Sequence, residues 1–127
     1  MADVVVTVPM RLWAEWLAEG CLPGEEWDGK TEYHFWIPQS ECPHMTGLST
    51  MSPGDRVYIV AHGKLRGYAP IVRIERVCKL RPGRSCLVRR AGAVAVTVAE
   101  PIRGFQGWRY RWWEREDEML LPEWETP

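Results

Sequence analysis

The feature that most constrains the fold is a central stretch, residues 54–77, in which turn-forming and strand-forming residues alternate. A Pro-Gly dipeptide at 53–54 is a turn signal, and Arg56–Ala61 is rich in the β-branched and aromatic residues that favour strands. His62–Lys64 contains a glycine where a three-residue hairpin loop needs one. The stretch therefore predicts a β-hairpin whose second strand covers Ile71–Val77.

Two residues interrupt the return arm of this hairpin. Gly67 has no side chain to pack, and Pro70 has no backbone N–H to donate to a neighbouring strand. Both residues are typical of a β-bulge or of a strand at the edge of a sheet. We therefore expect one of these two features in the return arm.

The hairpin also carries a resemblance to a known group of domains. The sequence Gly-Asp-Arg-Val-Tyr-Ile, followed by Gly-Lys-Leu-Arg-Gly-Tyr-Ala-Pro-Ile, resembles the central hairpin of the PUA-like superfamily, which includes the PUA, ASCH and EVE domains. The resemblance implies a mixed α/β, mainly β fold: a PUA-like pseudobarrel of five to seven short strands with one or two helices. Residues 1–127 would then form a single domain. The resemblance also implies binding of RNA or of a modified nucleobase.

Outside the hairpin, apolar periodicity predicts the remaining elements. A helix over Met10–Glu19 follows Pro9, a favourable first helical residue, and its apolar stripe is Trp13, Trp16 and Leu17. The acidic tail, residues 116–127, either docks through Leu120, Leu121 and Trp124 or stays loose. The predicted strands are Asp3–Val8, Lys30–Pro38, Cys86–Arg90, Ala93–Ala99 and Gly104–Glu114, and the longest predicted loop is Gln39–Pro53.

Composition excludes several classes of protein. No run approaches the roughly 18 apolar residues of a membrane span, and Val4–Pro9 is too short for the core of a signal peptide. We therefore expect a cytoplasmic protein without a membrane partner. The four cysteines form no Cys-x2-Cys pair, the spacing by which zinc sites are usually recognised in a sequence. We accordingly expect reduced thiols, no metal and no cofactor.

The net charge of −1 hides a strong asymmetry along the chain. Residues 1–55 hold two bases and nine acids (−7), residues 56–115 hold fourteen bases and three acids (+11), and residues 116–127 hold five acids and no base (−5). Thirteen of the sixteen basic residues are arginine, which suits planar recognition of anions and bases. Either this basic middle segment, residues 56–115, binds an anionic partner, or it pairs with the acidic ends within the fold.

The first functional hypothesis is a nucleic-acid-binding module. Arginines interleaved with aromatic rings can neutralise phosphates and stack on unpaired bases. RNA or another single-stranded nucleic acid, or a modified nucleoside, would be the partner, and the Gln39–Pro53 loop would act as a gate. The candidate ligand-binding residues are Trp36, Arg66, Trp108, Arg109 and Trp113.

Two alternatives remain open. Gly29-Lys30-Thr31-Glu32 resembles part of the ASCH signature, and some ASCH proteins are amidohydrolases that act on N4-acylated cytidine. The resemblance makes Lys30, Thr31 and Glu32 candidate catalytic residues, because such a trio can supply a base, a hydroxyl nucleophile and a proton carrier. The other alternative is a protein-interaction domain whose tryptophan patch meets a partner. Binding without catalysis is the favoured interpretation.

Overall fold

The computed structural model describes residues 3–19, 32–38, 55–75 and 84–126, with the backbone alone for residues 34–38, 74–75 and 84–86. Within these ranges the chain is mainly β with a single α-helix, which confirms the predicted class. None of the described helices is long and apolar enough to cross a membrane. The elements are β1 (Val4–Thr7), α1 (Met10–Leu17), β2 (Glu32–Pro38), β3 (Arg56–Ala61), β4 (Lys64–Glu75), β5 (Arg84–Arg90), β6 (Val96–Thr97), β7 (Trp108–Tyr110), η2 (Arg115–Asp117), β8 (Met119–Leu120) and η3 (Glu123–Glu125).

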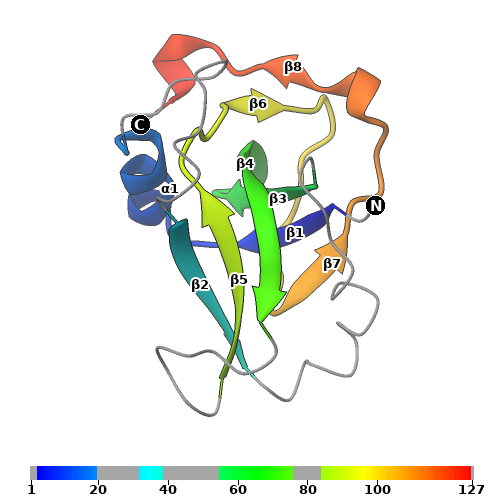
Figure 1. The fold of residues 1–127 in the computed structure, drawn as a ribbon. Coiled ribbons are helices and arrows are strands. Elements are labelled where there is room, and N and C mark those ends of the chain that lie inside the picture. Colours follow the sequence, from blue (N-terminus) through cyan, green and yellow to red (C-terminus); the bar gives the residue numbers. More distant parts are fainter. Residues whose placement is uncertain (1–2, 20–31, 39–54, 76–83, 127) are drawn as a thin grey trace.

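Six strands form one mixed sheet in the order β2-β5-β4-β3-β1-β7, and β6 pairs with β8 in a separate two-stranded sheet (Figure 1). β1 runs parallel to β3, whereas the other neighbouring strands run antiparallel. The described part of the chain thus contains eight strands rather than five to seven, because the C-terminal residues add the short strand β8, which pairs with β6. β2 and β7 lie at the two ends of the six-strand order, so the described strands form an open sheet.

The predicted hairpin is present as β3 and β4, but its turn has two residues rather than three. His62 and Gly63 both have positive φ, 51° and 72°, as the type I′ turn of a two-residue hairpin requires. Lys64 pairs with Ala61 and so already belongs to the return strand. The return strand therefore begins well before the predicted Ile71.

β4 is an interior strand that changes partner at Pro70. Residues 64–70 pair with β3 and residues 71–75 pair with β5, so the proline lies where one ladder ends and the next begins. Of the two features expected in the return arm, the β-bulge is the one present, which confirms the prediction. Ile59 pairs with Gly67 and Val60 pairs with Leu65, which leaves Arg66 as the extra residue on β4.

Gly67 is also a point of close approach between α1 and the sheet. A Cβ atom on this residue would lie 2.2 Å from the carbonyl oxygen of Val94 and 2.5 Å from Cζ2 of Trp13. Trp13 is fully buried, and Tyr68 and Val94 exchange two backbone hydrogen bonds of 3.0 and 2.9 Å beside it. Only glycine leaves room for both neighbours.

The sheet is buried on both faces, which explains why β1 is a continuous apolar run rather than an alternating one. Val4 and Val6 pack with Trp13 and Trp16 of α1 on one face. Val5 lies on the other face, where the residues of the second core cluster are Tyr58, Val60, Leu65, Val96, Val98, Ile102 and Trp113. The helix thus covers one face and the C-terminal third of the chain covers the other.

Residues 114–126, which we call the C-terminal strap, pack along this second face. Leu121 is buried, and its N–H donates to the carbonyl of Ala95 over 3.1 Å. The tail therefore docks, although Leu120 and Trp124 stay exposed. The predicted strand Ala93–Ala99 is reduced to a bridge at Val94 and the two residues of β6, because this segment pairs first with Tyr68 and then with β8.

Candidate functional site

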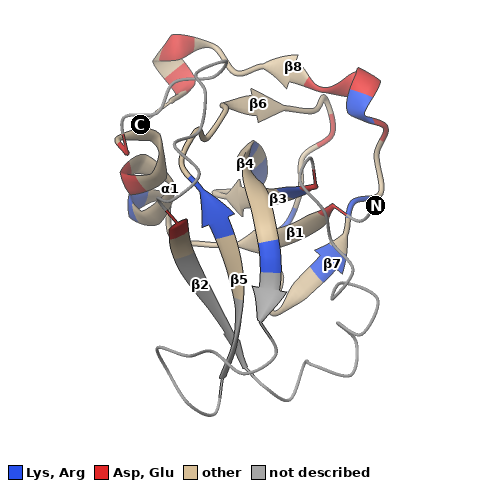
Figure 2. Ribbon diagram, viewed as in Figure 1, with Lys and Arg blue, Asp and Glu red and all other residues tan. Residues whose placement is uncertain are grey.

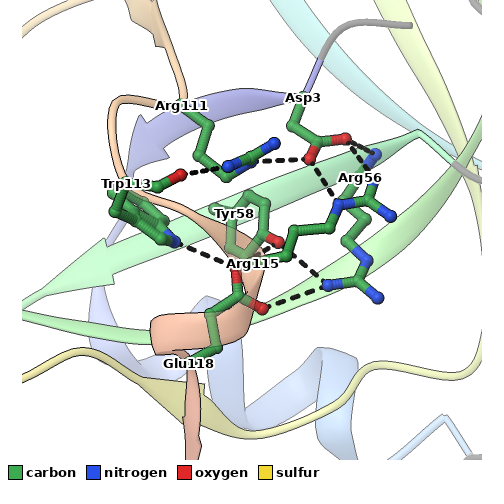
Figure 3. A network of polar contacts seen from close by, with 7 residues as sticks. All are labelled: Asp3, Arg56, Tyr58, Arg111, Trp113, Arg115 and Glu118. Atoms are coloured by element: carbon green, nitrogen blue, oxygen red, sulfur yellow. Dashed lines mark hydrogen bonds and ion pairs between the residues drawn. The ribbon is translucent and has the colours of Figure 1, made fainter.

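A network of seven polar and aromatic residues connects the N-terminus, the hairpin and the C-terminal strap (Figure 3). Asp3 precedes β1, two members lie on β3, and the others lie between the end of β7 and the strap. The network is a dense cluster of charged side chains, so it is a candidate site for chemistry. Its members are Asp3, Arg56, Tyr58, Arg111, Trp113, Arg115 and Glu118.

The Glu118 carboxylate is held by three donors. Tyr58 donates its hydroxyl to Oε2 over 2.5 Å, Trp113 donates Nε1–H to the same oxygen over 2.9 Å, and Arg56 donates to Oε1 over 3.1 Å. The side chain of Glu118 is 6% exposed. Burial, followed by the hydrogen bond to Glu118, raises the pKa of Tyr58. A carboxylate with three donors and almost no exposure is built to hold the strap, not to transfer protons.

Asp3 is the second anchor of the network. Its carboxylate accepts hydrogen bonds from Arg111 (2.8 Å) and from two nitrogens of Arg115 (2.9 and 2.8 Å), and from the backbone N–H of Arg56 (3.0 Å). Burial alone would raise the pKa of Asp3, but the hydrogen bonds from Arg115 and Arg111 outweigh it and lower the pKa. Asp3 therefore stays ionised and ties the N-terminus to the segment after β7.

Similar pairs occur elsewhere. Arg89 makes a two-pronged contact with Glu19 (2.7 and 2.6 Å), and its guanidinium lies 3.6 Å from the ring centroid of Trp16. Arg73 pairs with Glu32 in the same way (2.7 and 3.0 Å). The basic residues of the middle segment with acidic partners from the two ends of the chain are Arg56, Lys64, Arg73, Arg89, Arg111 and Arg115.

The basic middle segment was expected either to bind an anionic partner or to pair with the acidic ends of the chain, and the ion pairs bear on this choice. In the described ranges, much of the basic middle segment is neutralised by the acidic ends of the same chain, and Figure 2 shows acidic and basic positions near each other around the fold. An anionic partner would have to meet the remaining basic residues. Arg103 and Arg109 are exposed basic residues of the segment without an ion pair to a described carboxylate.

Arg109 lies among aromatic rings on the segment leading into and out of β7, and Arg103 precedes these rings on the same segment. The guanidinium carbon of Arg109 lies 4.4 Å from the ring centroid of Phe105, and the Phe105 and Trp112 centroids are 6.4 Å apart. Trp112 is 47% exposed and donates Nε1–H to Glu100 over 3.1 Å. We call Arg103, Phe105, Arg109 and Trp112 the arginine–aromatic surface.

Local anchors hold this surface in place. Ile102 is buried, and its N–H donates to the carbonyl of Gly63 at the hairpin tip over 2.9 Å. The N–H of Phe105 donates to Oγ1 of Thr7 over 3.1 Å. Gly107 has φ 77°, a left-handed conformation that turns the chain into β7, which then pairs with β1. The surface therefore lies on a segment fixed at both ends.

The chain is similar to a known protein family. Residues 40–117 match the family described as "Protein of unknown function (DUF1489)". The chain belongs to this family. The DUF1489 match covers well over half of the chain and contains the whole arginine–aromatic surface, whereas Asp3 lies far outside it and Glu118 directly follows it. No curated protein and no solved structure matches the chain.

Within the DUF1489 match, the predicted ligand-binding residues have different environments. Arg109 is exposed, and Trp108 is half-buried against the core beneath α1. Arg66 donates to the backbone carbonyls of Ala61 (3.0 Å) and Glu125 (3.4 Å). Trp113 is 7% exposed, with its ring edge-on to Tyr58, so it is a core residue rather than a stacking platform.

The remaining predicted site residues lie at or beyond the limits of the described chain. Lys30, Thr31 and the Gln39–Pro53 loop fall outside the described residues, as does the side chain of Trp36. Glu32 is described, and its carboxylate faces Arg73. Cys21, Cys42 and Cys78, together with the side chain of Cys86, are also outside the described part.

Sequence reasoning missed three members of the arginine–aromatic surface: Arg103, Phe105 and Trp112. Phe105 and Trp112 lie in the aromatic-rich segment Gly104–Glu114, which composition marks as unusual. The signal that could have found them is the pair of glycines, Gly104 and Gly107, which predicts a turn that brings Phe105 back towards Arg109.

Proposed function

We propose that this DUF1489 protein binds single-stranded RNA or a modified nucleobase on its arginine–aromatic surface. The observation that carries the proposal is the state of Arg109. Its guanidinium is exposed and lies over Phe105, without an ion pair to a described carboxylate, whereas arginines such as Arg56 and Arg89 are paired with acids. An arginine held by a ring rather than by an acid keeps its donors available for a phosphate or a base edge.

The aromatic members supply the second ingredient of single-strand recognition. Trp112 is about half exposed. Stacking of a base on such a ring contributes roughly 1–3 kcal/mol to the binding free energy, whichever base it is. Phe105 is partly covered by Arg109, so it orients the guanidinium instead of offering a free face. The surface thus combines one stacking platform with a fixed cation.

The charge pattern limits how strongly phosphates can contribute. If Arg103 and Arg109 each neutralise one phosphate, the logarithm of the affinity should fall with the logarithm of salt concentration with a slope of about −1.4, twice the value of about −0.7 per contact for single strands. Such a shallow slope favours recognition of a few nucleotides or of one base over binding along a long strand.

The fold gives further support for a member of the PUA-like group, and we propose a PUA-like pseudobarrel. A helix follows directly on the first strand, and β4 changes neighbours from β3 to β5, so one strand connects the two halves of the sheet. The amidohydrolase alternative is less favoured. The carboxylate of Glu32 is engaged at both oxygens by Arg73, so the contacts of this residue in the described part of the chain are those of an ion pair.

The test is fluorescence anisotropy with labelled RNA and DNA oligonucleotides of the same sequence, at several salt concentrations, together with a panel of modified nucleosides as competitors. Arg109→Ala should weaken binding and reduce the salt slope by about 0.7. Trp112→Ala should weaken binding roughly tenfold at every salt concentration, because stacking does not depend on counterions. Arg11→Ala is the matched control, since Arg11 is an exposed arginine on α1.

Equal effects of Arg109→Ala and Arg11→Ala would show that only general charge matters, which contradicts the proposed surface. Absence of binding by every oligonucleotide and nucleoside would overturn the function itself. Competition by one modified nucleoside, with loss on Trp112→Ala, would identify a base as the ligand.

A further inference from the structure

A second surface lies on the C-terminal strap and has a different character. Met119, Leu120 and Trp124 are 49%, 80% and 81% exposed, so three large apolar side chains within residues 119–124 face solvent. We call these three residues the strap patch. Single exposed apolar residues are common, but a group at one place, rimmed by polar residues, typically marks a binding surface.

The rim of the strap patch is acidic. Glu116, Asp117 and Glu123 are exposed and make no ion pair with another described residue. Figure 2 shows acidic positions on η2 and η3, at the two ends of β8. Glu118 and Glu125 of the same strap differ from these three acids, because they pair with Arg56 and Lys64 and hold the strap against the fold.

The backbone at the patch is an edge. β8 is one of two strands in its sheet, and β6 is its neighbour, through Val96–Leu120 and Thr97–Met119 pairing. The other side of β8 has no partner strand in the described part of the chain. An extended segment could therefore pair along β8 while its side chains meet the strap patch.

We propose that the strap patch docks a basic, amphipathic peptide segment of a partner protein. The apolar side chains would anchor alternate residues of the segment, and the acidic rim would pair with its lysines or arginines. The same acids repel phosphates, so nucleic acid is not the occupant of this surface. Because β8 is only two residues long and the patch is small, the interaction is a weak, reversible one.

This surface is separate from the one proposed to bind RNA. In Figure 1, β8 runs along one end of the molecule whereas β7 lies next to β1 and away from that end, and the two surfaces carry opposite charge. The two proposals can therefore be tested, and can fail, independently.

The probe is a fluorescein-labelled synthetic peptide of alternating lysine and leucine, titrated with the full chain and followed by fluorescence anisotropy. A peptide of alternating glutamate and leucine is the control for unspecific apolar contact. We expect the lysine peptide to bind, the glutamate peptide not to bind, and the affinity to fall as salt is added.

Variants locate the contact. Leu120→Ser and Trp124→Ala should each weaken binding about tenfold, the effect of losing one buried apolar anchor. Both side chains are at least 80% exposed, so the melting temperature should not change. Glu116→Lys should weaken binding a few-fold through charge alone. Tyr110→Ser is the matched control, because Tyr110 is an exposed aromatic residue on β7, 49% accessible.

Absence of lysine-peptide binding would overturn the proposal, as would equal losses for Leu120→Ser and Tyr110→Ser. If the chain formed a dimer that Leu120→Ser dissociated, the occupant would be a second copy and the proposal would be wrong.

Discussion

Replacing Gly67 with alanine would place a methyl group in space that two neighbours already occupy. The added carbon would lie 2.2 Å from the carbonyl oxygen of Val94 and 2.5 and 2.7 Å from two ring carbons of Trp13. Backbone crowds it on one side and a fully buried indole on the other, so neither neighbour can move away cheaply.

The expected loss of stability follows from these contacts. Overpacking a rigid core costs about 1–3 kcal/mol. Moving the Val94 carbonyl would also strain or break the two hydrogen bonds between Val94 and Tyr68, each worth about 1 kcal/mol. The sum, roughly 3–5 kcal/mol, is a large part of the roughly 5–15 kcal/mol by which a domain is stable.

Gly63→Ala provides the matched control. Gly63 also has a positive φ, 72°, but an added Cβ would meet nothing within 4 Å. Alanine there should cost only the left-handed backbone penalty of about 1–2 kcal/mol. Urea unfolding followed by tryptophan fluorescence would measure both variants, with the free-energy difference taken from the midpoints at a common slope.

The reasoning is refuted if Gly67→Ala costs no more than Gly63→Ala. That result would mean that α1 and the Val94 segment can withdraw from the sheet without penalty. An intermediate loss together with a changed urea slope would instead indicate that the variant exposes part of the core in its folded state.

Three further predictions concern the ion pairs. Asp3→Asn should cost about 2–3 kcal/mol at neutral pH, less than a fully buried pair because Arg111 is partly exposed. Folding lowers the pKa of Asp3, so the contribution of Asp3 to the free energy of unfolding is fully present above the unfolded carboxyl pKa of about 3.9. This contribution is lost as the pH falls through the folded pKa. Urea titrations should therefore show that the Asn variant loses less stability than the parent between neutral pH and pH 3. In an ultraviolet pH titration, the phenol of Tyr58 should ionise only above the ordinary tyrosine range near pH 10, and Tyr58→Phe should remove that late step from the curve. Arg89→Lys should cost about 2 kcal/mol because it loses a two-pronged buried pair and a ring contact, whereas Arg73→Lys, at a more exposed pair, should stay under about 1 kcal/mol in thermal melts.

The elements that sequence could predict are those specified by nearby residues. The β3–β4 hairpin follows from turn residues between two strand-forming runs, and α1 follows from the spacing of Trp13 and Trp16 after Pro9. Even here the turn length was wrong. The sequence pattern favours a turn in which only glycine has a left-handed conformation. A two-residue turn with His62 in that conformation is less common.

What sequence could not predict depends on distant partners. Trp112 and Trp113 are adjacent and identical, yet one is 47% exposed and the other 7%. A strand over Gly104–Glu114 would put Trp113 on the same face as Arg109, but β7 ends at Tyr110, so strand alternation does not extend to Trp113. The pairing of Asp3 with Arg111 and Arg115 joins positions more than a hundred residues apart, and no local pattern contains that information.

The central place of β1 also sets the order in which the sheet can be finished. Val4 pairs with Val57 on one side and Tyr110 on the other, separations of 57 − 4 = 53 and 110 − 4 = 106 residues. Such remote pairings are slow to find, and domains dominated by them fold in roughly milliseconds to seconds. Until β7 (Trp108–Tyr110) has paired with β1, the backbone groups along one edge of this apolar strand have no partner strand. During synthesis, β1 is made before both of its partner strands, and its unpaired edge is exposed to aggregation until they have been made.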